Sequence, residues 1–233
     1  KGFARSFAVA AEVSKAQNAI TLIGIEPTFP STGFGYIQRG ESIQADAGTY
    51  GVVTFKEKPD YETAQGYVES GNYLWNCGYF VGSVATFVEE IQRFAPELES
   101  TYQRLAGIAE HGGEEYNAAY LGLDNQVIDI ALMEKAKDLA VVSADFDWMD
   151  VGSFKDLHDV VPKNEAGNYV RGEAVYLVES ENSYVRNEEI DKPIAVIGLD
   201  NVVVVNTKDG ILIARKDMSA RCGEVAKQLQ SKP

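Results

Sequence analysis

The sequence TYGVVTFKEKPD, residues 49–60, decides how the chain is interpreted, because it joins a strand pattern to a charged turn. Residues 49–54 read as a β-strand, and the run FKEKPD follows at its end. Proline fixes its own φ and restricts the residue before it, so Glu57 and Lys58 are held in a defined direction. Ligands usually bind at strand ends in open α/β sheets, so a site that needs one acceptor and one cation is expected here. A surface turn is the alternative, since Glu, Lys, Pro and Asp are all common in turns.

The composition indicates a folded, acidic protein. The chain has 233 residues and 45% hydrophobic content, which suits one large domain or a domain with a small appendage. Its 35 acidic residues outnumber 21 basic ones, giving a formal charge of −14. That charge disfavours a broad grip on nucleic acid, so no nucleic-acid partner is expected, and any bound phosphate needs local cations or a metal.

The number of cysteines and the hydropathy of the sequence indicate in which cellular compartment the protein is expected. The chain has two cysteines, Cys77 and Cys222, and the sequence shows no secretory segment, no N-glycosylation sequon and no apolar run of membrane-spanning length. We therefore expect a cytoplasmic protein that does not bind membranes.

Alternating strand and helix patterns predict an α/β domain over residues 1–162, with a sheet covered by helices on both faces. The expected strands are 19–25, 36–39, 48–55, 73–82 and 140–143, and the expected helices are 1–18, 61–69, 84–94, 97–108, 127–136 and 154–160. The chain opens with a helix that leads into a strand, which is part of a βαβ-type arrangement. We therefore expect an N-terminal portion of this domain to be missing.

A second, smaller part is predicted over residues 163–233. Short β-rich segments at 174–179, 183–186, 194–199, 202–207 and 211–215 are separated by turn residues, and residues 218–230 read as a terminal helix. We expect a small β-rich C-terminal subdomain, and the sequence shows no strict repeat.

Glycines and one amide are the next candidates for a binding site. Gly33 and Gly35 in TGFGYI (32–37) allow backbone to approach a ligand closely, although a glycine-rich turn is the alternative. Asn76 is the strongly polar side chain of the apolar strand YLWNCGYF (73–80), and it must find partners. A pair of sugar hydroxyls or the neighbouring backbone would satisfy it. Cys77 is interpreted as a small buried side chain.

An aspartate in FDWMDVGSF (146–154) is the candidate metal ligand. Asp150 stands in an apolar frame, and Gly152 follows at the turn into a helix. Mg²⁺ prefers such oxygen ligands, whereas the alternative is that Asp150 or Ser153 simply caps the helix. The histidines, His111 and His158, have no metal-ligand spacing with each other, and both are interpreted as surface residues.

Taken together and in this order, these segments resemble the mannose-1-phosphate guanylyltransferases of the sugar nucleotidyltransferase superfamily. The resemblance covers nearly the whole chain. Its segments are GIEPTFPSTGFGYI (24–37), FKEKPD (55–60), YLWNCGYF (73–80), VIDIALMEKA (127–136), FDWMDVGSF (146–154) and GLDNVVVVNTKDGILIA (198–214). It implies a Rossmann-like mixed sheet followed by a β-rich part often used in subunit contacts, so a homodimer is expected.

The same resemblance implies a reaction and a set of site residues. Mannose 1-phosphate and GTP would give GDP-mannose and pyrophosphate, with Mg²⁺ as cofactor. Lys58 would hold the sugar phosphate, Glu57 and Asn76 the sugar hydroxyls, and Asp150 the Mg²⁺, so that Lys58 and Asp150 are the catalytic pair. The remaining residues implied to bind substrate are Gly33, Gly35, Tyr36, Gly78 and Gly152, while Asp129 and Glu134 would organise the pocket wall.

This sequence departs from the family pattern in one important respect. The glycine-rich nucleotide loop, with its following arginine and lysine, and the first metal-binding aspartate are not found in it. We therefore expect the chain to be inactive alone, with the missing part binding GTP. A cysteine at position 77, where serine is usual, is a minor difference. A non-catalytic subunit that binds a sugar nucleotide is the alternative function.

Overall fold

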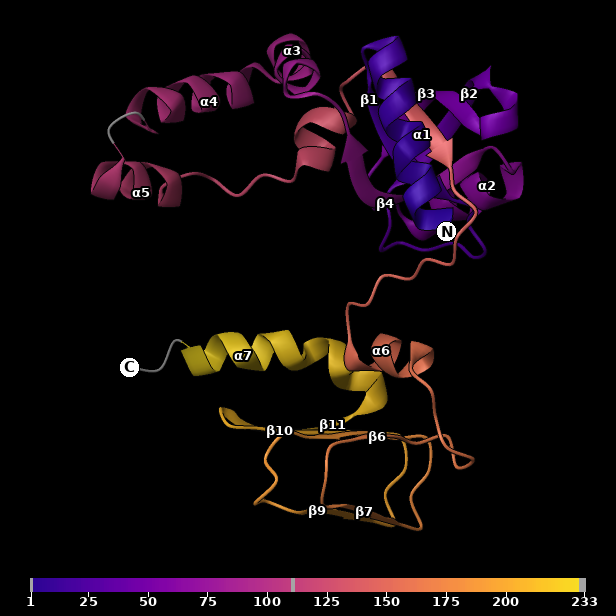
Figure 1. The fold of residues 1–233 in the computed structure, drawn as a ribbon, viewed down its shortest axis with the longest axis vertical. Helices are drawn as coiled ribbons and strands as arrows, with labels where there is room; N and C mark the ends of the chain where they lie inside the picture. The colour runs from indigo at the N-terminus through magenta and orange to yellow at the C-terminus, as the bar shows by residue number, and fades with distance from the viewer. Residues whose placement is uncertain (1, 110–111, 231–233) are drawn as a thin grey trace. The chain divides into compact units, whose positions relative to one another are not determined.

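The computed structural model describes residues 2–109 and 112–230, and the chain divides into two compact units between Trp148 and Met149 (Figure 1). This point lies earlier in the chain than the division expected after residue 162. His111 lies outside the described residues, so its predicted exposure stays a prediction. Each unit is described below by itself.

The first unit is built on a mixed sheet of five strands, as predicted. They are β1 (Ile20–Ile25), β2 (Tyr36–Gln44), β3 (Thr49–Lys56), β4 (Tyr73–Val81) and β5 (Leu139–Ser143). The order is β1-β4-β2-β3-β5, and β5 returns to pair with β1, so the sheet closes on itself. The β1–β5 pair is parallel and the other pairs are antiparallel.

Helices cover both faces of this sheet because alternate residues of each strand point to opposite sides. On one face, Ile23 and Val142 pack with Ala10 of α1 (Gly2–Gln17). On the other, Ile20 and Leu22 pack in the main core with residues of α3 (Val84–Phe94). Full burial of one such side chain contributes about 1.5–3 kcal/mol to stability. Helices were expected on both faces of the sheet, and the packing of α1 and α3 confirms this.

The helix after FKEKPD starts and stops where the sequence indicates. Asp60 caps α2 (Tyr61–Ser70), because its carboxylate accepts from the backbone N–H of Thr63 at 2.8 Å. Gly71 ends the helix in the left-handed conformation, with φ of 67°. The cap places a well-defined helix directly after the Glu57–Lys58 turn.

Two helices project away from the sheet in Figure 1: α4 (Pro96–Ala109) and α5 (Gly113–Leu121). The second of these was not predicted. Its sequence, GEEYNAAYL, has no apolar stripe, and none of its described residues is buried. A helix with little core to pack against leaves little hydrophobic periodicity to detect.

The segment that returns from α5 to the sheet was predicted as an α-helix over 127–136, and that prediction is wrong. The structure has a single π-helical turn, η2 (Asp129–Met133). The backbone N–H of Glu134 donates to the carbonyl of Asp129 at 2.9 Å, which is the i→i+5 bond of a π-helix. Leu132 and Met133 anchor this turn in the main core.

The second unit has two facing layers of parallel strands. One layer contains β6 (Tyr169–Arg171), β8 (Tyr184–Asn187) and β10 (Val202–Thr207), with β11 (Gly210–Arg215) added antiparallel at its edge. The other layer contains β7 (Val175–Val178) and β9 (Ile194–Ile197). Helix α6 (Phe154–Val160), the turn η3 (Lys216–Arg221) and helix α7 (Cys222–Gln230) complete the unit.

These layers are coils of a structural repeat, although the sequence shows no strict repeat. The amide of Asn182 donates to Asn201 at 2.5 Å and the amide of Asn206 donates to Asn187 at 2.9 Å, both across a separation of 19 residues. Asn182 and Asn201 also share a left-handed φ, of 51° and 56°. The repeat lies in backbone conformation and amide ladders, while the intervening residues differ.

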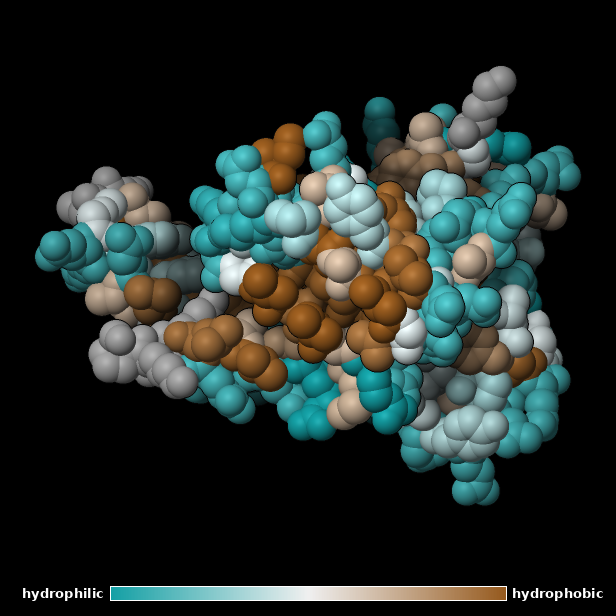
Figure 2. Space-filling view, turned by 90° about the horizontal axis from the view of Figure 1, so that it is seen from below, coloured by the Kyte–Doolittle hydropathy of each residue, from teal (hydrophilic) through white to brown (hydrophobic). Residues whose placement is uncertain are grey.

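A hydrophobic face covers the outside of the β7–β9 layer. Figure 2 looks onto this side and shows hydrophobic residues gathered there. Tyr176, Val178 and Ile197 contribute to it and are 61%, 49% and 66% exposed. Contiguous apolar surface of this kind marks an interaction site in many proteins.

His158 is buried rather than at the surface, so its predicted exposure is wrong. It lies on α6 and is 1% exposed. Its Nε2 bonds the carbonyl of Gly167 at 2.9 Å, and its Nδ1 lies 3.3 Å from Nζ of Lys216. Lys216 also donates to the backbone carbonyl of Asn182 at 2.7 Å. Two titratable groups, His158 and Lys216, are therefore buried next to each other in this unit.

Across the described residues, no helix combines the length and the apolar character needed to span a membrane.

Candidate functional site

The register of the first sheet brings Gly35, Glu57 and Asn76 together. β2 lies between β3 and β4, and Tyr36 is paired with Lys56 on one side and Trp75 on the other. Both pairs are antiparallel, so one step back along β2 faces one step forward on each neighbour. The backbone N–H of Asn76 donates to the carbonyl of Gly35 at 2.8 Å. These three residues, far apart in sequence, therefore form one small site.

Glu57 and Lys58 form the charged side of this site. Nζ of Lys58 lies 3.2 Å from Oε1 of Glu57, with the lysine side chain 61% exposed and the glutamate side chain 11% exposed. Lys58 adopts φ of 43°, a left-handed conformation that non-glycine residues rarely take. The residue before a proline usually adopts an extended conformation, so this backbone is strained. The charge pair predicted from FKEKPD is present, and its ammonium group is open to solvent.

Asn76 is held on both ends of its amide. Its Nδ2 donates to Oδ1 of Asp129 at 2.9 Å, and its Oδ1 accepts from the backbone N–H of Gly78 at 3.0 Å. Gly78 has φ of 73°, so a side chain there would be strained. Neighbouring backbone therefore supplies one partner of the amide, and a carboxylate supplies another. Among the described residues, one amide hydrogen and one carbonyl lone pair stay free for a further partner.

The π-helical turn supplies two further carboxylates. Oε1 of Glu134 accepts from the backbone N–H of Glu57 at 2.9 Å and from Nζ of Lys56 at 3.1 Å. Asp129 bonds Asn76, as described above. Reasoning from the residues alone did not single out these two side chains. Their spacing in VIDIALMEKA would have served as a signal only if the wide turn had been foreseen.

The charges of the site act on Glu57. Burial raises the pKa of the Glu57 carboxyl, while the hydrogen bond from Lys58 opposes the increase. The nearby carboxylates of Asp129 and Glu134 raise this pKa further. Three carboxylates share the site with the ammonium groups of Lys56 and Lys58, and Lys58 is the more exposed of these two lysines, at 61% against 49%.

Gly33 lies in the loop that leads into β2, and Tyr36 is the first residue of that strand. The backbone N–H of Gly33 donates to Oγ of Ser31 at 3.1 Å. Tyr36 is fully buried, and its hydroxyl bonds the backbone of Ser31 twice, at 2.9 and 3.1 Å. Tyr36 therefore holds the loop in shape, and its predicted contact with substrate stays a prediction.

Asp150 and Gly152 lie at the start of the second unit, before α6. Asp150 is exposed, and a Cβ atom on Gly152 would lie 3.6 Å from its Oδ2. The cap of α6 is Ser153, whose Oγ accepts from the N–H of Asp156 at 3.2 Å. Of the two capping alternatives the structure therefore selects Ser153. Within the described residues, no three His, Cys, Asp or Glu side chains gather to hold a metal ion.

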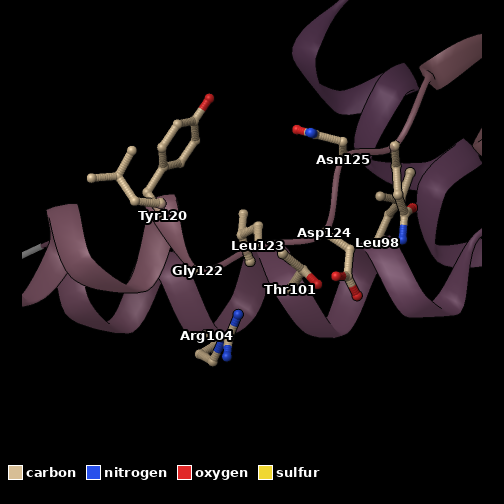
Figure 3. Close-up of a pocket in the computed structure, with 10 residues that line it drawn as sticks. Leu98, Thr101, Arg104, Tyr120, Gly122, Leu123, Asp124 and Asn125 are labelled. Carbon is tan, nitrogen blue, oxygen red and sulfur yellow. The ribbon is translucent and has the colours of Figure 1, made fainter. Parts of the chain in front are cut away.

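A cavity of about 600 Å³ lies elsewhere in the first unit, between α4, α5 and the segment that follows (Figure 3). Figure 3 shows Tyr120 and Asn125 pointing to one side of the connecting segment, and Arg104 and Asp124 to the other. Because these polar groups do not converge on one point, the cluster around Glu57 and Asn76 is the better candidate site.

Comparison with known proteins gives consistent matches for both units. A family profile described as nucleotidyl transferase matches residues 3–167, and one described as MannoseP isomerase/GMP-like beta-helix domain matches residues 172–229. A mannose-1-phosphate guanylyltransferase of Klebsiella pneumoniae is 38% identical over 213 residues, covering 90% of this chain and 45% of that protein. The xanthan biosynthesis protein XanB of Xanthomonas campestris pv. campestris (strain B100) is 37% identical over 237 residues, covering 98% and 48%.

A solved structure agrees over nearly the whole chain. It is described as mannose-1-phosphate geranyltransferase from Thermus thermophilus, is 29% identical, and gives a TM-score of 0.79. The match covers 99% of this chain and 65% of that one. The chain spans about half the length of the curated relatives it matches.

The fold and the site define an α/β domain that gathers a cation, carboxylates and an amide around neighbouring strands of its sheet, as domains that bind small polar ligands do. The chain belongs to the nucleotidyl transferase family, with a β-helix domain after it.

Proposed function

We propose that the whole protein transfers GMP from GTP to mannose 1-phosphate, giving GDP-mannose and pyrophosphate. The observation that carries this proposal is the exposed ammonium group of Lys58 beside Glu57, Asn76 and Gly35. Relatives named mannose-1-phosphate guanylyltransferase support the choice of sugar and nucleotide. Since the chain spans about half of those relatives, the activity is proposed for the whole protein.

The chemistry of the reaction explains why a site with one cation and no general base would be enough to bind and orient the sugar phosphate. The phosphate oxygen of the sugar is already ionised, so its attack on a nucleotide phosphate needs no general base. Two anions must be brought together, and positioning and charge neutralisation do most of the work. Lys58 would offset the negative charge of the sugar phosphate, while Glu57 and Asn76 would form hydrogen bonds with the hydroxyls of the sugar. An acidic protein can therefore bind a phosphorylated sugar through one local cation.

We propose Mg²⁺ as cofactor, with Asp150 as a ligand. Mg²⁺ usually keeps several waters and is bound through one or two carboxylates together with substrate phosphates. A single exposed carboxylate at Asp150 fits such a site, in which three protein ligands are not needed. When bound, the ion would neutralise charge on the phosphates. Gly152, two residues on, leaves open space beside that carboxylate.

A non-catalytic role is the alternative, and the comparisons do not favour it. Relatives from several bacteria carry the name of the enzyme. A module that only bound a sugar nucleotide would not need both a phosphate anchor and a metal ligand. Titration with GDP-mannose followed by a turnover assay separates the two roles, because the alternative predicts binding without turnover.

The first test concerns the phosphate anchor. Mannose 1-phosphate binding is measured by calorimetry in the whole protein, in Lys58→Ala and in Lys137→Ala, a lysine that is also exposed. Loss of one charged hydrogen bond predicts a fall in affinity of about tenfold or more for Lys58→Ala and no change for the control. Pyrophosphate release should require Mg²⁺, GTP and mannose 1-phosphate together. An undiminished rate in Lys58→Ala would exclude the anchoring role.

The second test concerns the metal. Asp150→Asn should shift the Mg²⁺ titration of activity to higher concentration, because the amide is a weaker ligand than the carboxylate. Asp147→Asn, at another exposed aspartate three positions earlier in the sequence, is the matched control. Identical titrations in the two variants would remove Asp150 from the metal site.

We further propose a cytoplasmic homodimer. Both cysteines are free in the structure, as a reducing compartment favours. The hydrophobic face of β7 and β9 offers a surface for a second copy. Sedimentation velocity tests this, since Ile197→Glu should convert a dimer to a monomer if that face is the contact. A monomeric unsubstituted protein would contradict the proposal.

A further inference from the structure

The π-helical turn η2 begins at Asp129 and is directly followed by Glu134, and the carboxylates of both residues bond groups of the site. We infer that Asp129 and Glu134 are positioning residues, which fix the amide of Asn76 and the backbone of Glu57 in the orientations that a sugar phosphate requires. This inference rests on the proposed function for its ligand. Its geometry is independent of that function.

Asp129 decides which groups Asn76 presents. An amide can turn over and exchange its carbonyl and NH₂ groups unless its partners distinguish them. Here Oδ1 of Asp129 accepts at 2.9 Å and the N–H of Gly78 donates at 3.0 Å, so only one orientation satisfies both. The free N–H and the free carbonyl lone pair of Asn76 are thereby held in fixed directions.

Glu134 fixes the turn that carries the charge pair. Its Oε1 accepts from the backbone N–H of Glu57 at 2.9 Å, across 77 residues of sequence. The same oxygen accepts from Lys56 at 3.1 Å, so the last residue of β3 and the first residue after it share one partner. The strained φ of Lys58 directly follows this contact, which holds the strand end while the chain turns.

The π-helical geometry lets one short segment make both contacts. In an α-helix, residues five apart are separated by about 140° around the axis, so their side chains leave on different faces. In a turn closed by an i→i+5 bond, residues five apart complete about one turn and lie one above the other. The N–H of Glu134 bonds the carbonyl of Asp129. From this one turn, Asp129 reaches the amide of Asn76 in β4 and Glu134 reaches the end of β3. A regular α-helix over this sequence would lose one of these contacts.

A direct test observes Asn76 without any ligand. Side-chain amide signals of the whole protein are recorded by NMR after ¹⁵N labelling of asparagine, and the Asn76 pair is assigned by its absence in Asn76→Asp. In Asp129→Ala the pair should shift and exchange faster with water, because its acceptor is gone. Asp129→Asn keeps an oxygen acceptor and should retain slow exchange. Unchanged signals in Asp129→Ala would overturn the role of Asp129.

A kinetic test follows the consequence for the reaction. Asp129→Ala and Glu134→Ala should each raise KM for mannose 1-phosphate about tenfold, as expected for the loss of a hydrogen bond that involves a charged group. Their KM for GTP and their kcat should stay within twofold (about 0.4 kcal/mol). Asp129→Asn and Glu134→Gln, which keep the accepting oxygen, should restore most of the KM. Glu115→Ala, at an exposed carboxylate of α5, is the control.

The outcomes separate the two proposals. If the unsubstituted protein does not bind mannose 1-phosphate, the proposed function fails, while the amide signals still decide the role of Asp129. If it binds and turns over, but the alanine variants keep its KM, the positioning role fails and the function stands. Equal losses in KM for both substrates, with no rescue by Asn or Gln, would mean a general structural defect and would also overturn the inference.

Discussion

Gly35 and the carboxylate of Glu57 are packed so closely that no side chain fits between them. A Cβ atom on Gly35 would lie 2.6 Å from Oε2 of Glu57 and 3.2 Å from Cβ of Asn76. Real Cβ contacts are almost never as short as the first of these, so the carboxylate would have to move. Gly35 does not have a positive φ, so its need for glycine arises from crowding, to which Cζ of Phe55 adds a further contact at 3.2 Å.

Gly35→Ala should therefore weaken binding of mannose 1-phosphate more than it weakens the fold. The methyl group pushes the flexible Glu57 side chain away from the sugar position, and we expect a fall in affinity of about tenfold, which is ~1.4 kcal/mol. The melting temperature should change little. Calorimetry and thermal unfolding together measure the two effects.

The matched control is Gly66→Ala in α2, where a Cβ atom has no neighbour within 4 Å. Alanine is favoured over glycine in a helix by about 1 kcal/mol, so this variant should be slightly more stable and should bind normally. A Gly35→Ala protein that bound sugar phosphate as tightly as Gly66→Ala would show that Glu57 does not contact the sugar.

Residues near Gly35 also show how far sequence reasoning reaches. The strands around the site carry strong apolar patterns, and those of the first unit were predicted within a few residues, although β2 is longer than expected. Pairing order was not predictable, because the contact of Gly35 with Glu57 and Asn76 arises from β2 lying between β3 and β4. Local patterns define elements, whereas neighbours in a sheet depend on the whole chain.

The two thiols should differ sharply in reactivity. Burial raises the pKa of the Cys77 thiol to about 12, and its side chain lies within β4. Cys222 is partly exposed at the start of α7. The thiolate is the reactive form, so a disulfide reagent near neutral pH should label Cys222 in the folded protein and Cys77 only after unfolding in urea. Fast labelling of Cys222→Ser would contradict the buried position of Cys77.

Stability of the second unit should fall in mild acid because of His158. Burial lowers the pKa of its imidazole below the ordinary 6.5, and the nearby ammonium groups of Lys216 and Lys163 lower it further. The hydrogen bond to the carbonyl of Gly167 and the carboxylate of Asp159 oppose this decrease in pKa without reversing it. Above pH 6.5 the ring is neutral whether the chain is folded or not, so titration has no effect. Below it the unfolded chain binds a proton that the folded chain does not, and stability decreases until the pH passes the folded pKa.

Hydrogen exchange of the β8 and β10 amides, followed from about pH 8 to about pH 5, measures this decrease after correction for the intrinsic rate. In His158→Gln the side chain can still donate to Gly167 but no longer titrates, so this part of the pH dependence should disappear. A decrease of the same size in His158→Gln would assign it to other groups.

The β-helix and the π-helical turn could not be predicted from the sequence, for a physical reason. Asn182 and Asn201 occupy equivalent left-handed positions of successive coils, yet their neighbours Ser183 and Val202 share no side-chain chemistry. In η2 the extra residue of the wide turn leaves no mark on apolar periodicity over so short a segment. Both features depend on backbone geometry, which composition reflects only weakly.

The two capping alternatives before α6 lead to a last prediction. Ser153 accepts from the N–H of Asp156 and donates to its carboxylate at 2.7 Å, so Ser153→Ala should lower the free energy of unfolding of the second unit by about 1 kcal/mol. Ser153→Asp keeps an acceptor for the helix N–H and should lose less. Asp150→Ala should leave stability unchanged, since Asp150 is exposed and does not cap the helix. Urea unfolding measures all three variants, and a loss in Asp150→Ala as large as in Ser153→Ala would return Asp150 to a structural role.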